Sequence, residues 1–428
     1  MDLFLSAAIA LIAGLLLTRV ASRFHLPDVT AYLVAGVLVG PYCLGLLGVP
    51  GLGFLSTEQV AQLDFIPTTA LGFIAFTIGS EFKLDDLKHT GRKILIIGVM
   101  EGVITSLVVD IVLLIAQRFL GGTISAAGAI TMGAIAAATA PAATLMVVRQ
   151  YKAKGAVTDV LLPTVALDDA VGLTVFAISF GIARAMSSGT VDVVSIAVNP
   201  LVQIVLSLLM GGLLGEVLNE LEKLFHSNRN RMALIVGFVL LTVALSMVEF
   251  DIGPVHVAFT SLLVCMALGA VFCNRCPLAD EMMDKADKWT SPLFAMFFVL
   301  SGAALELRVF ESAAVVGIGL LYIIFRCCGK YLGAYLGTTV TGYDQNVRKW
   351  LGVTLFPQAG VALGMSVAVS GWGEEGALIR NIILFGVLIY ELFGPVLTKY
   401  ALTRSGDIQP KSQEILERRA KYIEARGK

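Results

Sequence analysis

Two adjacent aspartates, Asp168 and Asp169, lie inside an apolar run that is long enough to cross a lipid bilayer. A carboxylate at membrane depth is costly, so such a residue is expected to serve a function and to have a partner. Because successive helical residues point about 100° apart, one acid can face a fixed partner while the other faces a cavity. Pro163, just upstream, removes a helical hydrogen bond and loosens the turn before the pair. These residues predict an ion and proton site.

A lysine in another apolar run offers a partner for one of these acids. Asp168 and Lys330 lie at similar distances from the cytoplasmic ends of their expected spans, ~12–18 Å into a core of about 30 Å. A lysine at that depth is either deprotonated or paired with an acid. The alternative is that Lys330 extends its ammonium group to the membrane interface. Arg326, one turn earlier, is expected to compensate charge, through packing or through a second acid.

Other acids within the apolar runs are weaker candidates. Glu101 and Asp110 are nine residues apart, so they should face opposite sides of one helix and not form one site. Glu81 lies near a cytoplasmic end, where we assign it to a funnel that attracts cations. A solvated surface role for Glu81 is the alternative.

Two of the apolar runs are interrupted by proline and small residues near their middle. Transporters often place their ion site where two membrane helices lose hydrogen bonding at mid-depth. We therefore expect two broken helices, with their interruptions at Pro141, Pro357, Gln358 and Gly360. Thr139, beside the first interruption, is the expected neutral oxygen ligand of a cation.

The composition indicates an all-α, polytopic membrane protein whose surroundings are a lipid bilayer. Of the 428 residues, 57% are hydrophobic and only 15% are charged, against roughly 25% charged in a soluble domain. The net charge of −1 and the lack of a basic cluster give no indication of nucleic-acid binding. The spacing of the six cysteines predicts neither a disulfide framework nor a metal site.

Taking about 20 apolar residues as one span, we expect about thirteen transmembrane helices. They are placed near 3–22, 28–44, 64–82, 93–117, 124–149, 156–185, 197–219, 231–249, 254–273, 289–305, 312–338, 349–371 and 377–402. Lys and Arg gather in alternate loops, which predicts an N-terminus outside the cell and a cytoplasmic C-terminus, with the chain in the inner membrane. Spans four to six and eleven to thirteen then have opposite orientation, the pattern of an inverted repeat. The first span is expected to be retained, and no regulatory domain is expected in the tail.

Several of these residues together resemble one family over about residues 5 to 402. They are Leu26-Pro27, Gly40-Pro41, Gly79-Ser80-Glu81-Phe82, Thr139-Ala140-Pro141, Asp168-Asp169, Gly329-Lys330-Tyr331-Leu332-Gly333 and Gly394-Pro395. The chain is similar to the monovalent cation/proton antiporter superfamily, in particular its Kef- and NapA-like branch. Unlike Kef members, it lacks their cytosolic regulatory domain and has aspartate at position 168.

The resemblance implies a NapA/NhaA-like fold with crossed discontinuous helices, a homodimer and an elevator-type movement. It assigns Asp169 as the ion carrier and pairs Asp168 with Lys330, in an exchange that is electrogenic. The implied division is as follows: dimerisation-domain helices at 1–92 and 223–306, core helices at 93–187 and 307–404, a linker helix at 188–222 and a short cytoplasmic tail at 405–428.

The expected function is exchange of a monovalent cation for protons, with Na⁺ as the first choice, K⁺ as the alternative and no bound cofactor. Burial favours the neutral form of Asp169, so that this carboxyl holds either a proton or a cation. Asp168, Asp169, Thr139 and freed backbone carbonyls would supply oxygen ligands. Sodium-coupled uptake of an organic anion is the main alternative, followed by an ion channel and, last, an intramembrane enzyme.

Overall fold

The computed structural model describes residues 2–23, 28–49, 52–80, 83–119, 122–187, 199–248, 250–252, 255–257, 259–306, 308 and 311–408. Helices dominate these ranges: α1 (Asp2–Arg23), α2 (Asp28–Val39), α3 (Thr57–Ala61), α4 (Phe65–Ser80), α5 (Leu84–Phe119), α6 (Ala126–Ala136), α7 (Pro141–Tyr151), α8 (Ala156–Ser187), α9 (Asn199–Glu222), α10 (Asn228–Ser246), α11 (Ser261–Arg275), α12 (Ala279–Ala303), α13 (Ala313–Val340), α14 (Gln345–Thr354), α15 (Gly360–Val369) and α16 (Gly373–Arg404). Two short 3₁₀ helices lie at Leu44–Leu47 and Ser370–Trp372.

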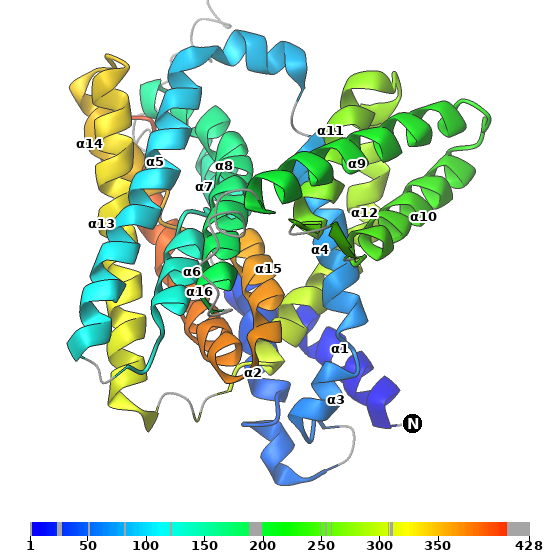
Figure 1. Cartoon of the computed structure of the whole chain (residues 1–428), viewed down its shortest axis with the longest axis vertical. Helices are drawn as coiled ribbons and strands as arrows, with labels where there is room; N and C mark the ends of the chain where they lie inside the picture. The colour runs from blue at the N-terminus through cyan, green and yellow to red at the C-terminus, as the bar shows by residue number, and fades with distance from the viewer. Residues whose placement is uncertain are drawn as a thin grey trace, which may run out of the picture.

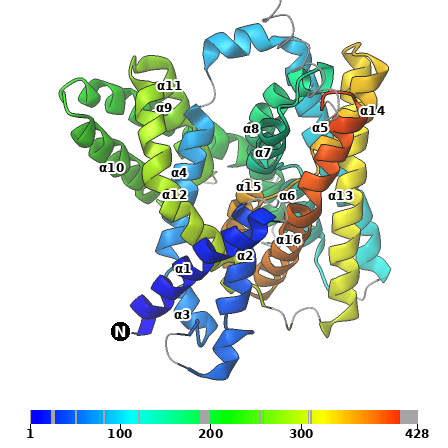
Figure 2. The ribbon, with the colours of Figure 1, turned by 180° about the vertical axis from the view of Figure 1, so that it is seen from behind.

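The helices form two groups that lie side by side (Figures 1 and 2). Helices α1–α4 and α9–α12 make up the first group, in which α11 packs along α4 and α9, and α12 packs along α2. Helices α5–α8 and α13–α16 make up the second group, in which α13 packs along α5. The second group corresponds to the expected core, and α16 touches α2 of the first group. That one group dimerises and the other moves remains a prediction.

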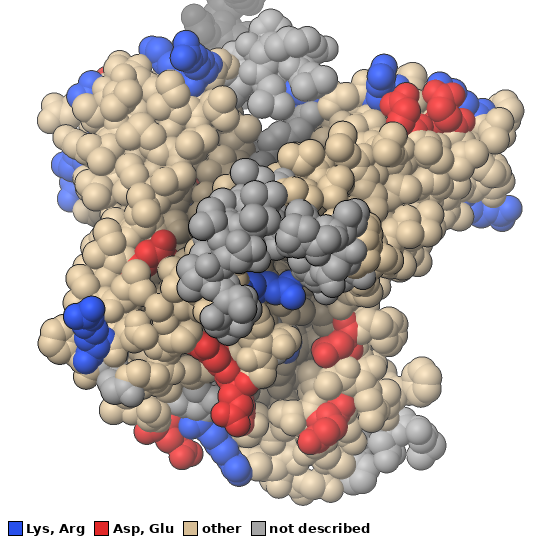
Figure 3. Space-filling view, in the orientation of Figure 1, with Lys and Arg blue, Asp and Glu red and all other residues tan. Residues whose placement is uncertain are grey.

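The outer surface is that of a protein surrounded by lipid. Seven described helices are long and apolar enough to cross a membrane, and six shorter apolar helices accompany them. On α5, Leu107, Ile111 and Ile115 form one exposed stripe, each more than half accessible. Figure 3 shows a face on which large areas between its two ends carry no Lys, Arg, Asp or Glu. The chain is therefore a multi-pass membrane protein, although the count of thirteen spans stays a prediction.

Helices α6 and α14 both end within an expected span. Each begins with a polar cap: Ser125 Oγ accepts from Gly128 N at 3.0 Å, and Asp344 Oδ1 accepts from Val347 N at 2.8 Å. The chain then leaves the helix over 137–140, before α7, and over 355–359, before α15. Both interruptions lie at the proline positions that the sequence singles out.

The apolar core of the second group surrounds these two interruptions. Ile135 on α6, Ile318 on α13, Leu363 on α15 and Ile383 on α16 are completely buried and belong to one cluster. Because this cluster contains few polar atoms, the backbone groups freed at the interruptions need partners from specific side chains.

The ninth expected span is wrong at its beginning. Residues near its start form strand β2 (Val255–Val257), which pairs antiparallel with strand β1 (Phe250–Ile252) in the segment before the span, with Phe250 opposite Val257. Helix α11 begins only at Ser261. The β-branched residues Ile252, Val255 and Val257 favour extended backbone, and hydropathy alone does not distinguish a short apolar strand from the start of a helix.

Helix α5 also differs from its expected span because it starts earlier, at Leu84, and bends at Gly91. Gly91 has a φ of 81°, a left-handed conformation that glycine adopts without strain. The straight part of α5 after this bend coincides with the expected fourth span. That part carries Glu101 and packs against α13.

Candidate functional site

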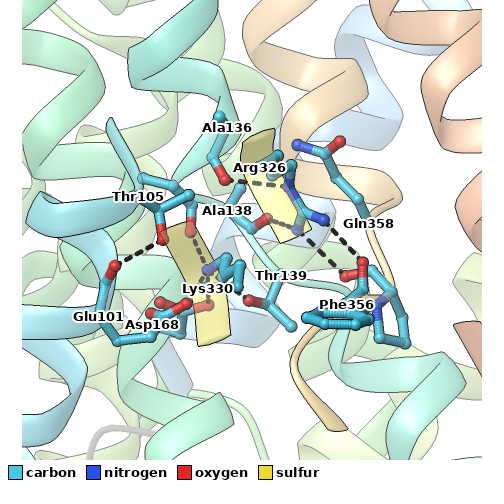
Figure 4. Close-up of polar contacts among 12 residues, drawn as sticks. Glu101, Thr105, Ala136, Ala138, Thr139, Asp168, Arg326, Lys330, Phe356 and Gln358 are labelled. Atoms are coloured by element: carbon cyan, nitrogen blue, oxygen red, sulfur yellow. Dashed lines mark hydrogen bonds and ion pairs between the residues drawn. The ribbon is translucent and has the colours of Figure 1, made fainter. Parts of the chain in front are cut away.

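The two interruptions lie against each other at the centre of the second group. The backbone N–H of Ala140, at the end of the first, donates to the carbonyl of Pro357 in the second, at 2.9 Å. Both interruptions are therefore parts of one polar centre, to which α8 and α13 add charged side chains (Figure 4). Breaking the helices frees carbonyl groups that a continuous helix would satisfy, and in a buried centre these groups need hydrogen-bond donors.

Arg326 on α13 donates hydrogen bonds to carbonyl groups from both interruptions. Its Nε donates to Ala136 O at 3.0 Å, and its Nη2 donates to Ala138 O at 2.6 Å. Its Nη1 donates to Phe356 O at 2.7 Å, and Nη2 also reaches Pro357 O at 3.4 Å. The guanidinium lies over the ring of Tyr390, 4.5 Å from the ring centroid. Arg326 is completely buried, and no carboxylate in the described part of the chain pairs with it.

Lys330, one turn further along α13, binds only the first interruption and the acids beside it. Its ammonium donates to the carbonyl of Ala137 and to Thr139 Oγ1, the latter at 2.8 Å. It also lies 3.0 Å from Asp168 Oδ2 on α8. Asp168 and Lys330 are both completely buried. The lysine therefore connects α13, the first interruption and α8, and does not extend to the interface.

Glu101 is the residue at this centre that sequence reasoning assigned too little weight. Its carboxylate forms an ion pair with Lys330, and it is completely buried like its partner. Asp110, by contrast, faces Gly133 of α6, and its Oδ2 accepts from Ser106 Oγ on its own helix at 3.5 Å. The expectation that Glu101 and Asp110 form no common site agrees with this arrangement. The low ranking of Glu101 was wrong, because helical periodicity shows that it has a separate face but not which charge it meets.

The second interruption is held by neutral groups in addition to Arg326. The Nε2 of Gln358 donates to Ile135 O at 3.0 Å, and the hydroxyl of Tyr322 donates to Gln358 Oε1 at 3.1 Å. Gln358 and Tyr322 are both completely buried. Gly360 begins α15 and makes no unusually close contact, because a Cβ there would lie 3.9 Å from Phe298.

Three predicted residues lie wholly or partly outside the described structure. The backbone of Asp169 belongs to α8 and that of Pro141 begins α7, but their side chains are not among the described ones. Glu81 lies outside the described residues altogether. The roles assigned to these three residues therefore remain predictions.

Helix α8, which carries Asp168, is anchored at its start by an acid from the far end of the chain. Asp407 Oδ2 accepts from Thr158 N at 2.7 Å and from Thr158 Oγ1 at 2.8 Å. The backbone N–H of Lys154 donates to Asp407 O at 2.9 Å. An acid at the start of a helix also interacts favourably with the helix dipole, so this contact ties the start of α8 to the segment that follows α16.

Four of the carbonyl groups freed at the interruptions already accept hydrogen bonds from side chains, and the expected role of freed carbonyls as cation ligands remains a prediction. Those of Ala136, Ala137, Ala138 and Phe356 each accept a hydrogen bond from Arg326 or Lys330. The oxygen atoms with remaining capacity are carboxylate oxygens, and Asp168 Oδ1 has no hydrogen-bond partner among the described residues. This arrangement suits exchange of small cations and protons at the acids.

A comparison of the chain with models of protein families identifies its family. The family model described as sodium/hydrogen exchanger, transmembrane, matches residues 7–402. The chain belongs to this family. The resemblance drawn from the sequence motifs is thereby confirmed, and this exchanger-family protein is a transporter rather than an enzyme.

Two curated proteins illustrate the range of relatives. Cation/H(+) antiporter 17 of Arabidopsis thaliana is 25% identical over 354 residues, which are 78% of this chain and 40% of the plant protein. Na(+)/H(+) antiporter NhaS4 of Synechocystis sp. is 23% identical over 360 residues, which are 82% of this chain and 85% of that protein. This exchanger-family chain thus spans less than half the length of the plant relative.

Among solved structures, the sodium proton antiporter MjNhaP1 from Methanocaldococcus jannaschii is similar, with a TM-score of 0.73. The match covers 94% of this chain and 100% of that chain at 18% sequence identity. A likeness at this identity establishes the fold and leaves the transported ion open.

Proposed function

We propose that this protein exchanges a monovalent cation, Na⁺ in the first place and K⁺ as the alternative, for protons across the inner membrane. The second helix group carries the ion site and moves past the first by an elevator mechanism. The exchange is electrogenic, the chain acts as a homodimer, and the N-terminus lies outside while the C-terminus is cytoplasmic.

The observation that carries the proposal is the completely buried pair of Asp168 and Lys330 beside two interrupted helices. Buried charges in a membrane protein are retained where ions or protons pass. Transporters place such sites between discontinuous helices near the middle of the bilayer. An enzyme or a structural protein would have no reason to combine these features at one point.

The proposed mechanism is competition for carboxylate oxygens at Asp169 and Asp168. Either one cation or more than one proton compensates the charge of the acids, which lowers the cost of crossing the apolar barrier, and this unequal count makes the exchange electrogenic. Lys330 pairs with Asp168 and offsets part of the charge of the acids. Thr139 contributes a neutral oxygen once its contact with Lys330 is released. Exchange then follows because each ion must leave before the other binds.

The first experiment measures proton movement in proteoliposomes that contain the purified protein. A preformed pH gradient should dissipate when Na⁺ or K⁺ is added, and the response should depend on membrane potential if charge is moved. Absence of a response to both cations would contradict the proposal and direct the search to organic anions taken up together with Na⁺. Ion flux without proton coupling would instead indicate a channel.

The variant Asp169→Asn tests the assignment of the ion carrier. We expect exchange to be abolished, because the amide neither releases a proton nor offers a charged ligand. Asp159→Asn is the matched control, since Asp159 is an exposed acid in the first turn of the same helix. Normal exchange by the Asp169 variant would show that another residue carries the ion.

A further inference from the structure

Glu101 takes no part in the mechanism proposed above, although it lies in the same buried centre. It comes from α5, whereas Asp168 comes from α8, and both meet the one ammonium group of Lys330 (Figure 4). All three side chains are completely buried. The buried ammonium group of Lys330 is therefore shared between two acids from different helices.

The contact between Glu101 and Lys330 is set by close packing of their two helices. A Cβ atom on Gly329 would lie 2.8 Å from Thr105 Cα, and one on Gly333 would lie 2.7 Å from Glu101 Cα. Glycines on either side of Lys330 thus let the backbones of α13 and α5 approach directly. Because larger residues at these positions would collide with the backbone, Glu101 and Lys330 are held in fixed positions relative to each other.

Lys330 has more acceptors than it has hydrogens to donate. An ammonium group has three N–H donors, whereas Lys330 is next to four acceptor groups: Ala137 O, Thr139 Oγ1, Asp168 Oδ2 and the carboxylate of Glu101. At any moment at least one of them lacks a full hydrogen bond. Asp168 and Glu101 therefore compete for the ammonium group of Lys330.

We propose that Glu101 is a positioning residue, the resident counter-ion of Lys330, which frees Asp168 to bind the transported cation. When Asp168 turns toward the cation, Glu101 keeps Lys330 paired and leaves its contacts with the first interruption unchanged. Without Glu101, Lys330 has only Asp168 as its anionic partner and holds it away from the cation. This role rests on the proposed function and adds a specific prediction about affinity to it.

The test compares the affinity and maximal rate of exchange in variants of the full-length protein in proteoliposomes. In Glu101→Gln, the KM for Na⁺ should rise about tenfold, which corresponds to about 1.4 kcal/mol, while the maximal rate stays within about twofold of the wild type. Glu101→Asp retains the charge but shortens its reach, and its KM should lie between the two. Asp110→Asn removes the other acid of α5 beyond Gly91, which faces Gly133 of α6, and should leave KM unchanged.

A second measurement separates an action through Lys330 from the direct field of the Glu101 charge. The shift of the melting temperature with Na⁺ concentration gives an apparent Kd in detergent, also for variants that no longer transport. In a Lys330→Met background, Glu101→Gln should change this Kd by less than about twofold, because the shared partner is gone. An equal loss in both backgrounds would overturn the proposal, and so would an unchanged KM in Glu101→Gln alone.

The two proposals fail in different ways. If the wild-type protein moves no protons on addition of Na⁺ or K⁺, the proposed function is wrong. If the wild type exchanges ions and Glu101→Gln retains its KM, only the role of Glu101 is wrong.

Discussion

The first helix interruption, at 137–140, contacts a lysine and its acids in addition to Arg326, whereas the second, at 355–359, is bound by Arg326 and otherwise carries neutral side chains. Lys330 binds the first interruption together with Asp168 and Glu101. At the second interruption, Gln358 and Tyr322 form a network of amide and hydroxyl groups. Arg326 alone serves both. The two halves of the centre have similar backbones and different chemistry.

This difference indicates where ions are handled. Freed carbonyls can be satisfied by neutral donors, as Gln358 shows, so stability does not require a lysine and two acids at the first interruption. Replacing a buried ion pair by apolar residues is often neutral or stabilising. The charged half therefore fits an ion-handling role, and the neutral half fits a structural one. The following variants test this comparison, beginning with the largest expected effect.

Arg326→Met should destabilise both halves of the centre. Four carbonyl contacts are lost at once, but Pro357 O keeps its bond from Ala140 N. At about 1 kcal/mol or more for each of the three buried acceptors left unpaired, the loss is at least about 3 kcal/mol. Thermal unfolding in detergent measures this. Arg348→Met is the matched control because Arg348 Nε binds one partly buried carbonyl, that of Tyr343, at 2.7 Å. Equal melting temperatures for the two variants would show that Arg326 does not hold the interruptions.

Lys330→Met should affect only the charged half, with a stability loss of about 2–3 kcal/mol. Its distinctive effect should be on pH dependence. Without the ammonium group, the two acids lose the cation that pairs with both of them, which changes the balance between proton binding and cation binding at this centre. The pH profile of exchange in proteoliposomes should therefore shift. A profile identical to that of the wild type would remove Lys330 from the mechanism.

Tyr322→Phe should affect only the neutral half. The hydroxyl partner of Gln358 is removed, which should cost about 1 kcal/mol in stability. The pH profile and the KM for Na⁺ should stay as in the wild type, since no charge changes. A shifted pH profile in this variant would contradict the division into an ion-handling half and a structural half.

Glu281→Gln removes an ion pair that is exposed to water, and its effect on stability is the reference for the buried ion pairs. Glu281 lies 2.5 Å from Lys285 near the start of α12, and the hydrogen bond and charge of Lys285 hold the pKa of Glu281 below its usual value. A carboxyl whose pKa is lower in the folded state stabilises the fold at pH values above its unfolded-state pKa. This stabilisation is lost as the pH falls through the folded-state pKa. At pH 7 the variant should melt within error of the wild type, because exposed pairs contribute little. A large loss would mean that surface and buried pairs cannot be contrasted in this way.

A different comparison concerns buried acids with and without a partner. Glu391 on α16 is buried, and neither of its carboxylate oxygens has a hydrogen-bond partner among the described residues. Asp168 and Glu101, in contrast, share a lysine. Burial without a partner costs free energy, so Glu391→Gln should preserve the fold and melt at or above the wild-type temperature. A clear decrease in the melting temperature would reveal a partner for Glu391.

Hydropathy and local chemistry were sufficient to predict much of the molecule. The low charge content predicted a helical membrane protein, and Pro141 and Pro357 predicted where two helices stop. Asp168 and Lys330 were paired because each is an ionisable group at similar depth in an apolar run. Those inferences depend on the cost of polar groups in lipid, which a single segment already reveals.

The contacts between distant segments could not be predicted from the sequence in this way. Periodicity placed Glu101 on its own face of α5, but only the packing of α5 against the glycines of α13 brought it to Lys330. The acceptors of Arg326 are backbone carbonyls, which every residue possesses, so no side-chain pattern marks them. The start of the ninth expected span became part of a hairpin because a short β-branched run carries no helical period. The sequence by itself determined which groups must be satisfied within the membrane, and the tertiary structure decided which partners satisfy them, because partner choice depends on how helices distant in the chain approach one another.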